Sequence, residues 1–215
     1  MNVISFYLEY FTNGKEDGKI MNKTIEYYNI NSDLFINSTK DVEFNKMQNM
    51  LIKYLKKGDC ILDLGCGSGR DSKAFLEKGF KVVSVDGSKK LCEFAKNYIG
   101  RDVINSTFQD FKSNIKFDGV WACASLLHLP YEELKKVMKN ISSMIKLEGY
   151  FYLSFKYGDF EGERNGRYFT DMTEEKFKEL IKDMKEYKLI EKHITEDVRA
   201  SRENEKWLNV ILKKV

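Results

Sequence analysis

Two acids and three glycines have the residue types and spacing of a site for a nucleotide-like ligand that carries a positive charge. Gly65, Gly67 and Gly69 alternate along the chain, and without a Cβ they can adopt positive φ and let a ligand lie against the backbone. Asp63 precedes them, and its carboxylate would repel a diphosphate but suits a ligand with an ammonium group. Asp86 ends the next apolar run, where a carboxylate either accepts hydrogen bonds from a ribose diol or caps a helix.

The glycine spacing separates this loop from two other nucleotide-binding loops. The dinucleotide fingerprint is Gly-x-Gly-x-x-Gly, whereas the third glycine here comes one residue earlier. The sequence also lacks the Gly-x-x-x-x-Gly-Lys pattern of a phosphate-binding loop. A tight turn is the alternative explanation for the glycines taken alone.

An alternation of apolar strands and amphipathic helices must position these residues, and this order is typical of a parallel sheet with crossover helices. Ligand sites in such sheets lie beyond the carboxyl ends of the strands. The expected strands are residues 60–64, 81–86, 103–108, 117–123, 150–155, 189–194 and 207–212. The expected helices after the glycine loop begin at residues 71, 88, 131 and 173.

The segment from Asp63 to Gly69 resembles motif I, Asp-x-Gly-x-Gly-x-Gly, of the class I S-adenosylmethionine-dependent methyltransferases. The resemblance covers roughly residues 24–215. It implies an α/β fold with a Rossmann-like seven-stranded sheet of order 3-2-1-4-5-7-6, the last strand antiparallel, and helices on both faces. It also implies S-adenosyl-L-methionine as methyl donor and S-adenosyl-L-homocysteine as product, with the amino-acid tail toward Asp63 and the sugar toward Asp86.

The resemblance assigns cofactor contacts along the whole first half of the sheet. Asp110 matches the acid that accepts from the adenine amine, with the adjacent N–H supplied by Phe111; a turn role for Asp110 is the alternative. Tyr27 or Tyr28 would close the pocket from an N-terminal helical cap, residues 22–57; ordinary core aromatic residues are the alternative at both positions. The full set of expected cofactor residues is Tyr28, Asp63, Gly65, Cys66, Gly67, Gly69, Arg70, Asp86, Gly87, Ser88, Gln109, Asp110, Phe111 and Cys123.

The residues after the fourth strand bear on the acceptor. Enzymes that methylate nucleobase amines carry Asn/Asp-Pro-Pro-aromatic there to grip a flipped base, but residues 122–125 are Ala-Cys-Ala-Ser. The following Leu-Leu-His-Leu resembles small-molecule enzymes related to the tellurite-resistance methyltransferases and, more distantly, wobble-uridine tRNA methyltransferases. His128 and Tyr168 are therefore the candidate catalytic residues, to orient a substrate or accept its proton. A histidine that simply hydrogen-bonds the backbone is the alternative for His128.

Two basic loops are expected to share one rim of this site. The first spans residues 156–169 and the second follows the sixth strand. Their cations would recognise an anionic group on the acceptor, and the alternative for both loops is a solvated, mobile surface. The expected rim residues are Lys156, Arg164, Arg167, Arg199 and Arg202.

Composition bounds the remaining possibilities. The 215 residues are 32% charged and 42% hydrophobic, which predicts one globular domain, residues 22–215, after a flexible N-terminal extension, residues 1–21. The net charge of +3 is too small to favour a nucleic-acid partner. The sequence contains no apolar run long enough for a membrane helix and no zinc-type cysteine spacing. A cytoplasmic protein that binds no metal and no membrane is expected.

Several functions stay open at this level. The acceptor atom is a thiol or chalcogenide, an oxygen or an amine. The alternatives to a small-molecule methyltransferase are a tRNA-modifying enzyme, a non-catalytic subunit that binds the donor, and a nicotinamide-dependent oxidoreductase. The oligomeric state has no signal in the sequence.

Overall fold

The fold is described from a computed structural model, which covers residue 20, residues 22–199, residue 202 and residues 204–215. The predicted extension, residues 1–21, therefore lies outside the described residues except for residue 20. No helix within the described ranges is long and apolar enough to cross a membrane.

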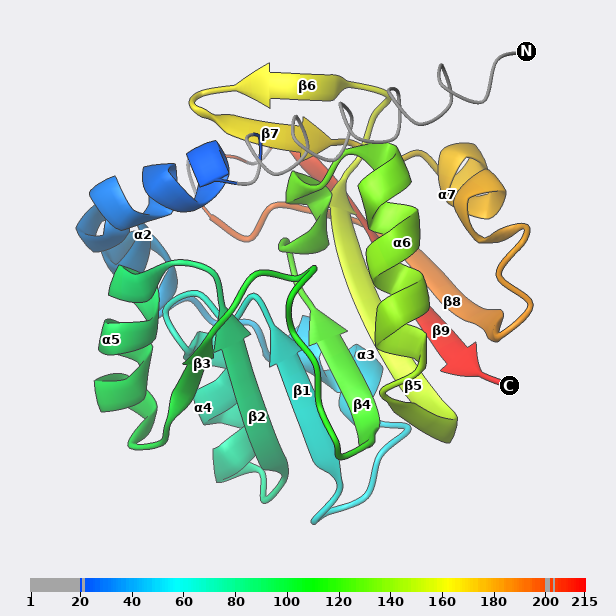
Figure 1. Cartoon of the computed structure of the whole chain (residues 1–215), viewed down its shortest axis with the longest axis horizontal. Helices are drawn as coiled ribbons and strands as arrows, with labels where there is room; N and C mark the ends of the chain where they lie inside the picture. The colour runs from blue at the N-terminus through cyan, green and yellow to red at the C-terminus, as the bar shows by residue number, and fades with distance from the viewer. Residues whose placement is uncertain (1–19, 21, 200–201, 203) are drawn as a thin grey trace, which may run out of the picture.

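A seven-stranded sheet in the order β3-β2-β1-β4-β5-β9-β8 forms the centre of the chain (Figure 1). The strands β3, β2, β1, β4 and β5 are parallel, and β9 runs antiparallel to both of its neighbours. Since β8 and β9 are the predicted sixth and seventh strands, the predicted order and the antiparallel last strand are confirmed. The strand bounds are β1 Cys60–Leu64, β2 Lys81–Asp86, β3 Val103–Asn105, β4 Phe117–Ala122, β5 Ile145–Lys156, β8 Tyr187–Glu196 and β9 Lys206–Lys214.

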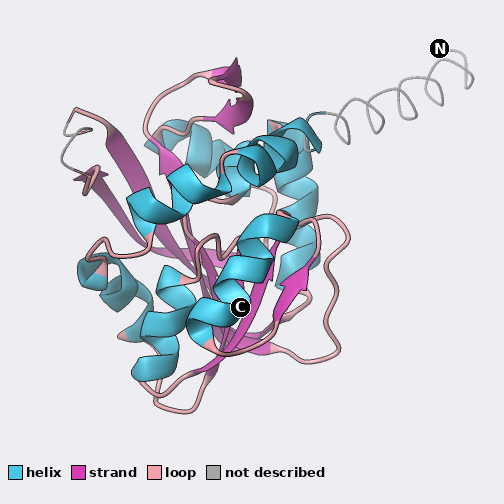
Figure 2. Ribbon diagram, turned by 90° about the vertical axis from the view of Figure 1, so that its left-hand side faces the viewer, coloured by secondary structure: helices cyan, strands magenta, loops and turns pink. Residues whose placement is uncertain are grey.

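Helices cover both faces of this sheet (Figures 1 and 2). One face packs against α6 and α7, and the other against α3 and α4. The sequence predicts the region after Thr173 as a helix to about residue 187, but α7 ends at Ile181 and β8 begins at Tyr187. The helix bounds are α2 Ser32–Thr39, α3 Asn45–Ile52, α4 Arg70–Glu77, α5 Lys89–Ile99, the short 3-10 helix η1 Leu126–His128, α6 Tyr131–Ser142 and α7 Glu174–Ile181.

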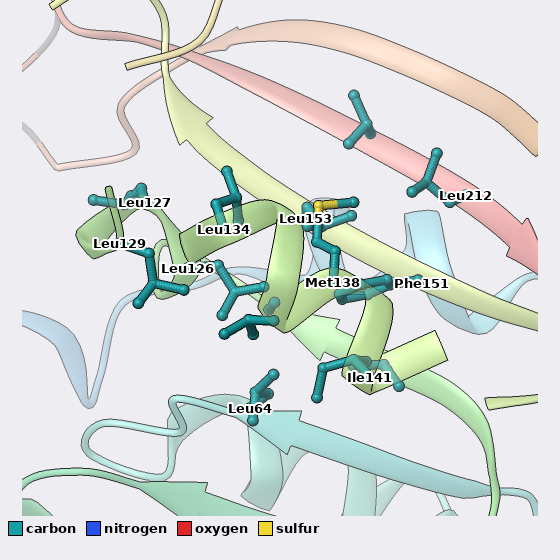
Figure 3. Close-up of a cluster of buried hydrophobic side chains, with 14 of the residues drawn as sticks. Leu64, Leu126, Leu127, Leu129, Leu134, Met138, Ile141, Phe151, Leu153 and Leu212 are labelled. Carbon is teal, nitrogen blue, oxygen red and sulfur yellow. The ribbon is translucent and has the colours of Figure 1, made fainter. Parts of the chain in front are cut away.

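The strands alternate their side chains between two apolar cores, as a pleated sheet requires. Leu62 and Leu64 of β1 face the larger core, which α6 closes (Figure 3), whereas Ile61 faces the smaller one. In the smaller core, Trp121 and Tyr152 stack with ring centroids 3.9 Å apart. These two cores favour one register of the strands, because a slip of one residue would move every side chain to the opposite face of the sheet and disrupt the packing of both cores.

The segment after β5 differs from its prediction as a mobile loop. It forms an antiparallel hairpin of β6 Glu161–Arg164 and β7 Arg167–Thr170. The hairpin lies beyond the carboxyl ends of β1, β2 and β4, on the same side of the molecule as α2 (Figure 1). The hairpin contacts the helical segment 22–30, since the backbone N–H of Tyr168 donates to Thr24 Oγ1 at 3.2 Å. Residues 156–169 show no strong alternation of apolar side chains, so the sequence does not predict this pairing.

Candidate functional site

A cavity of about 920 Å³ opens at the carboxyl ends of the central strands. Its floor is the turn after β1, and its walls come from the ends of β2, β4 and β5. The helical segment 22–30 and α2 cover it from one side, and the β6–β7 hairpin and the loop after β8 from the other. This volume is typical of a small-molecule or cofactor pocket.

The glycine loop can make its turn only without side chains at two positions. Gly65 has φ of +85° and Gly67 has φ of +55°, which favour glycine. A Cβ at Gly65 would lie 2.4 Å from Ser125 Cβ, and one at Gly67 would lie 2.9 Å from the Phe35 ring. The loop is therefore sandwiched between η1 and the cap, and both Gly65 and Gly67 line the cavity.

Asp86 is held at the cavity wall by this same loop. Its Oδ2 accepts from the N–H of Gly67 at 2.9 Å, and its Oδ1 accepts from the N–H of Ser88 at 2.8 Å. Burial raises the pKa of the Asp86 carboxyl, and these two hydrogen bonds oppose that effect. A carboxylate has about four lone-pair sites, so two remain for a ligand beside Gly87 and Ser88, which also line the cavity.

Asp63 does not line the cavity, in contrast to its expected place beside an ammonium group. Its side chain is buried, with 1% exposure, on the face of β1 that packs under α4. Its Oδ2 accepts from Ser72 Oγ at 2.6 Å, and that hydroxyl also contacts Ser84 Oγ at 2.7 Å. Burial, together with the nearby charge of Asp71, raises the pKa of Asp63 to about 8. The structure places Asp63 behind the glycine loop, as a support for the first turn of α4.

Asp71 reaches the cavity where Asp63 does not. Its carboxylate accepts two hydrogen bonds from Arg70, at 3.0 and 2.8 Å, and one each from Gln48 at 2.8 Å and Trp121 at 2.9 Å. The Arg70 charge and these donors hold the pKa of Asp71 below its usual value despite burial. The sequence indicates the helix-capping position of Asp71, but its partners Gln48 and Trp121 come from α3 and β4 and leave no local signal.

The predicted cap lies over the loop as expected for Tyr28. The Tyr28 ring packs edge-on against Phe35 with centroids 5.1 Å apart, and both residues line the cavity. Two polar contacts hold the cap against the turns that follow β1 and β2: Ser88 Oγ donates to Asn29 Oδ1 at 2.8 Å, and Thr39 Oγ1 donates to Ser68 Oγ at 3.2 Å.

His128 is buried, with 6% exposure, and both of its ring nitrogens have partners. Nδ1 lies 2.6 Å from the carbonyl oxygen of Tyr168, which can only accept, so Nδ1 carries the proton. Nε2 therefore accepts from the hydroxyl of Tyr28 at 2.9 Å. Burial lowers the pKa of His128 to about 4, so the imidazole is neutral near pH 7. Both His128 and Tyr28 line the cavity.

Tyr168 acts here through its backbone rather than its side chain. Its hydroxyl donates to Glu161 at 3.2 Å, and the residue does not line the cavity. The structure therefore does not bring the Tyr168 phenol to the site, in contrast to its expected catalytic place.

The end of the third strand approaches the cavity with different residues from those expected. Gln109, Asp110 and Phe111 do not line it. Asp110 is exposed and accepts from Thr107 Oγ1 at 2.7 Å, which is the turn role that the sequence left as the alternative. The residues that do line the cavity are Ser106, Thr107 and Phe108. The strand ends earlier than predicted, at Asn105, so the turn exposes these three residues instead.

The two cysteines of the site are protonated thiols. Cys66 and Cys123 both line the cavity. Burial raises the pKa of each, that of Cys123 to about 12, so neither is a ready nucleophile. The residue after Cys123 has a strained backbone: Ala124 has φ of +50°, and its N–H donates to Ser154 Oγ at 2.8 Å. Such strain is common at ligand sites.

The expected basic rim is present in part. Lys156, Arg167, Arg199 and Arg202 line the cavity. Arg164 does not line it, and its guanidinium makes a two-pronged ion pair with Asp171 at 2.8 and 2.6 Å. Of the expected cofactor residues, Arg70 also lines the cavity. Gly69 does not line it and is the N-cap of α4, with φ of +81°.

Residues 62–153 match the family described as a methyltransferase domain. A curated relative, the ubiquinone biosynthesis O-methyltransferase of Coxiella burnetii, is 31% identical over 114 residues, which are 48% of this chain and 48% of that protein. The chain thus spans about half the length of the curated relatives it matches. The similarity includes the glycine loop and the strand that leads to Asp86.

Two solved structures resemble most of the chain. The 1,6-didemethyltoxoflavin-N1-methyltransferase of Burkholderia thailandensis, with bound 1,6-didemethyltoxoflavin and S-adenosylhomocysteine, has a TM-score of 0.68 at 19% identity and covers 89% of this chain and 90% of its own. The magnesium protoporphyrin IX methyltransferase of Synechocystis PCC 6803 with bound S-adenosylhomocysteine has a TM-score of 0.69 at 17% identity. The match covers 88% of this chain and 97% of that enzyme's chain. At such identities the likeness shows a shared fold.

Proposed function

We propose that this chain, which carries a methyltransferase domain in the class I S-adenosylmethionine-dependent methyltransferase fold, transfers a methyl group from S-adenosylmethionine to a small-molecule acceptor. The similarity of residues 62–153 to the methyltransferase domain supports the reaction type. The relatives named above include an O-methyltransferase and an N-methyltransferase, so the attacking atom of the acceptor stays open. The resemblance to the tellurite-resistance enzymes stays a prediction.

The observation that carries this proposal is the position of Asp86 beside the glycine loop. Its carboxylate is oriented by two backbone N–H groups and keeps free lone pairs at the cavity wall. A ribose diol matches those lone pairs. Phe108 supplies an aromatic wall one strand further along, which suits an adenine ring. The residues present therefore fit a sulfonium nucleoside.

The donor supplies an electrophilic methyl group, and the chain itself contributes position and exclusion of water. The cap provides the exclusion, since Phe35 lies directly against Gly67 and Tyr28 lies against Phe35. The strained turn at Ala124 directs the backbone after β4 along the cavity wall. A concave cavity partly covered by the cap and the hairpin supports a small acceptor rather than a folded RNA.

A proton from an oxygen or nitrogen acceptor would leave through Tyr28 and His128. Because Nε2 of His128 already accepts from the Tyr28 hydroxyl, the hydroxyl rather than the imidazole would contact the acceptor. Tyr28 would take the acceptor proton while passing its own to Nε2, and the Tyr168 carbonyl holds the other nitrogen in place. Because burial lowers the pKa of His128 to about 4, the imidazolium would be short-lived and would lose the proton to solvent. A thiol or chalcogenide acceptor would need little assistance with proton removal.

Isothermal titration calorimetry with S-adenosylhomocysteine, followed by a library of small acceptors assayed for release of that product from S-adenosylmethionine, tests the proposal. Binding with turnover of at least one acceptor is the expected result. Binding without turnover of any library member would favour a non-catalytic donor-binding subunit, and turnover of unmodified tRNA alone would favour the RNA-modifying alternative. Failure to bind would overturn the proposal.

A further inference from the structure

The cations around the cavity are not equivalent. Arg70 pairs with Asp71, Arg199 pairs with Asp197, and both Lys156 and Arg202 contact Glu205. Each of these four cations thus already contacts a carboxylate, although Lys156 and Arg202 share that of Glu205. Their expected role as a general anion-binding rim is therefore weakened, because an incoming anion would have to compete with a carboxylate that is already in place.

Arg167 has no carboxylate within ion-pair distance in the part of the chain that the structure describes. Its Nη1 donates to the neutral hydroxyl of Tyr28 at 3.3 Å, and its Nε is buried without an acceptor. Most of the five donors of its guanidinium thus lack a described protein partner. A partly buried cation left in this state is costly unless a ligand completes it.

The position of Arg167 is nevertheless well defined. Its guanidinium lies over the Tyr27 ring, 4.5 Å from the centroid, and 5.1 Å from the centroid of Phe169. These ring contacts hold the planar group without using its N–H donors. The preceding Gly166 has φ of +75°, and a Cβ there would lie 2.9 Å from Tyr27. The tight turn therefore sets Arg167 against the cap.

We propose that Arg167 binds a carboxylate group of the methyl acceptor, an inference that rests on the proposed methyl transfer. The planar fork of an arginine matches a carboxylate in two parallel hydrogen bonds. Arg167 and His128 share the hydroxyl of Tyr28, so an anion on Arg167 lies beside the group that would receive the acceptor proton. The aromatic rings of Tyr27 and Phe169 favour an acceptor whose carboxylate is attached to a planar ring.

The donor's own amino-acid carboxylate is the other source of this chemistry, and binding measurements separate the two. We would titrate wild type, Arg167→Gln and Arg167→Lys with S-adenosylhomocysteine and with 5′-methylthioadenosine, which lacks the amino-acid tail. If Arg167 serves the acceptor, both affinities stay within about twofold of wild type in both variants. A loss of about tenfold or more for S-adenosylhomocysteine alone, the size of one charged hydrogen bond, would assign Arg167 to the donor and overturn the proposal.

Benzoate and its neutral analogue benzamide then probe the acceptor side with S-adenosylhomocysteine bound. Wild type should bind benzoate at least about tenfold more tightly than benzamide. Arg167→Gln should lose that preference, and Arg167→Lys should keep only part of it, because a lysine retains the charge but not the planar fork. Equal affinity for the two probes in wild type, or no binding of benzoate, would overturn the proposal.

Lys23→Gln is the matched control, because Lys23 contacts Glu163 of the same hairpin through an exposed ion pair. It should retain the benzoate preference, and a loss in this variant as well would mean that the hairpin rather than Arg167 carries it. Thermal unfolding of each variant identifies any that fails to fold. If Arg167→Gln fails to fold, the reduced benzoate preference of Arg167→Lys tests the proposal instead. Absence of S-adenosylhomocysteine binding in wild type would instead reject the proposed function, independently of Arg167.

Discussion

Replacement of Asp86 by alanine gives the most direct test of the donor site. The change removes two acceptor oxygens, each of which now holds one backbone N–H, together with the lone pairs left for a ribose diol. A hydrogen bond to a charged group contributes about 1.5–3 kcal/mol, which corresponds to roughly a 10- to 150-fold loss of affinity. We expect S-adenosylhomocysteine binding to weaken within this range.

Asp86→Asn should not restore the site fully. An amide has one acceptor oxygen and one NH₂ group, so its nitrogen would face the N–H of either Gly67 or Ser88. We therefore expect an affinity between those of wild type and Asp86→Ala. The control is Asp102→Asn, which changes a carboxyl on the surface with 90% of its side chain exposed, and which should leave binding unchanged.

Calorimetry with adenosine and 2′,3′-dideoxyadenosine isolates the diol. If Asp86 binds the diol, Asp86→Ala weakens the binding of adenosine but leaves the binding of the dideoxy compound almost unchanged. An equal loss for both ligands would refute the reasoning, since the substitution would then act by disordering the glycine loop. The loop's own contacts with Asp86 make this outcome a real alternative.

Three further predictions address the cap, the buried acid and the proton path. Gly67→Ala should weaken S-adenosylhomocysteine binding severalfold, because φ of +55° disfavours alanine and its Cβ meets Phe35 at 2.9 Å; adding Phe35→Leu should recover part of the loss, and no recovery would contradict the contact. Because burial raises the pKa of Asp63 to about 8, above the value of about 3.9 for an unfolded aspartate, its stabilising contribution is complete below about pH 4 and is lost as the pH rises toward 8. In urea unfolding, Asp63→Asn should therefore gain stability relative to wild type over that interval, and a constant difference would count against a protonated Asp63. Tyr28→Phe should reduce kcat for an oxygen or nitrogen acceptor by about 100-fold or more while S-adenosylhomocysteine still binds, and an unchanged kcat would exclude the Tyr28–His128 path.

The sequence identified the features that depend on short-range order. The glycines at alternate positions predicted the turn after β1, and the structure gives all three positive φ. The alternation of strands and helices, together with the resemblance, predicted the strand order of the sheet. These features are legible because backbone freedom and apolar periodicity are properties of neighbouring residues. The place of Asp86 at the end of β2 was predicted for the same reason.

Tertiary structure decided which of the candidate residues reach the cavity. Asp63 and Asp86 both belong to strands that run to the same edge, yet α4 covers the Asp63 side chain and leaves Asp86 at the wall. Asp110 was displaced because β3 is shorter than its apolar pattern suggested. Which face of a strand is covered, and where the strand ends, depends on helices distant in sequence.

The hydrogen bonds of His128 also depend on tertiary structure and could not be predicted from the sequence. The sequence by itself placed this histidine after β4, but it could not assign its proton, because the partners come from Tyr28 in the cap and from the backbone of Tyr168 in the hairpin. Likewise, the sequence identified a set of cations, and only the fold showed that Arg167 lacks a described carboxylate partner. Local sequence determined the conformation of the glycine loop, because positive φ depends on the residue type at each position. Long-range packing determined the hydrogen bonds of His128 and the ion pairs of the cations, because both depend on side chains brought together from separate segments.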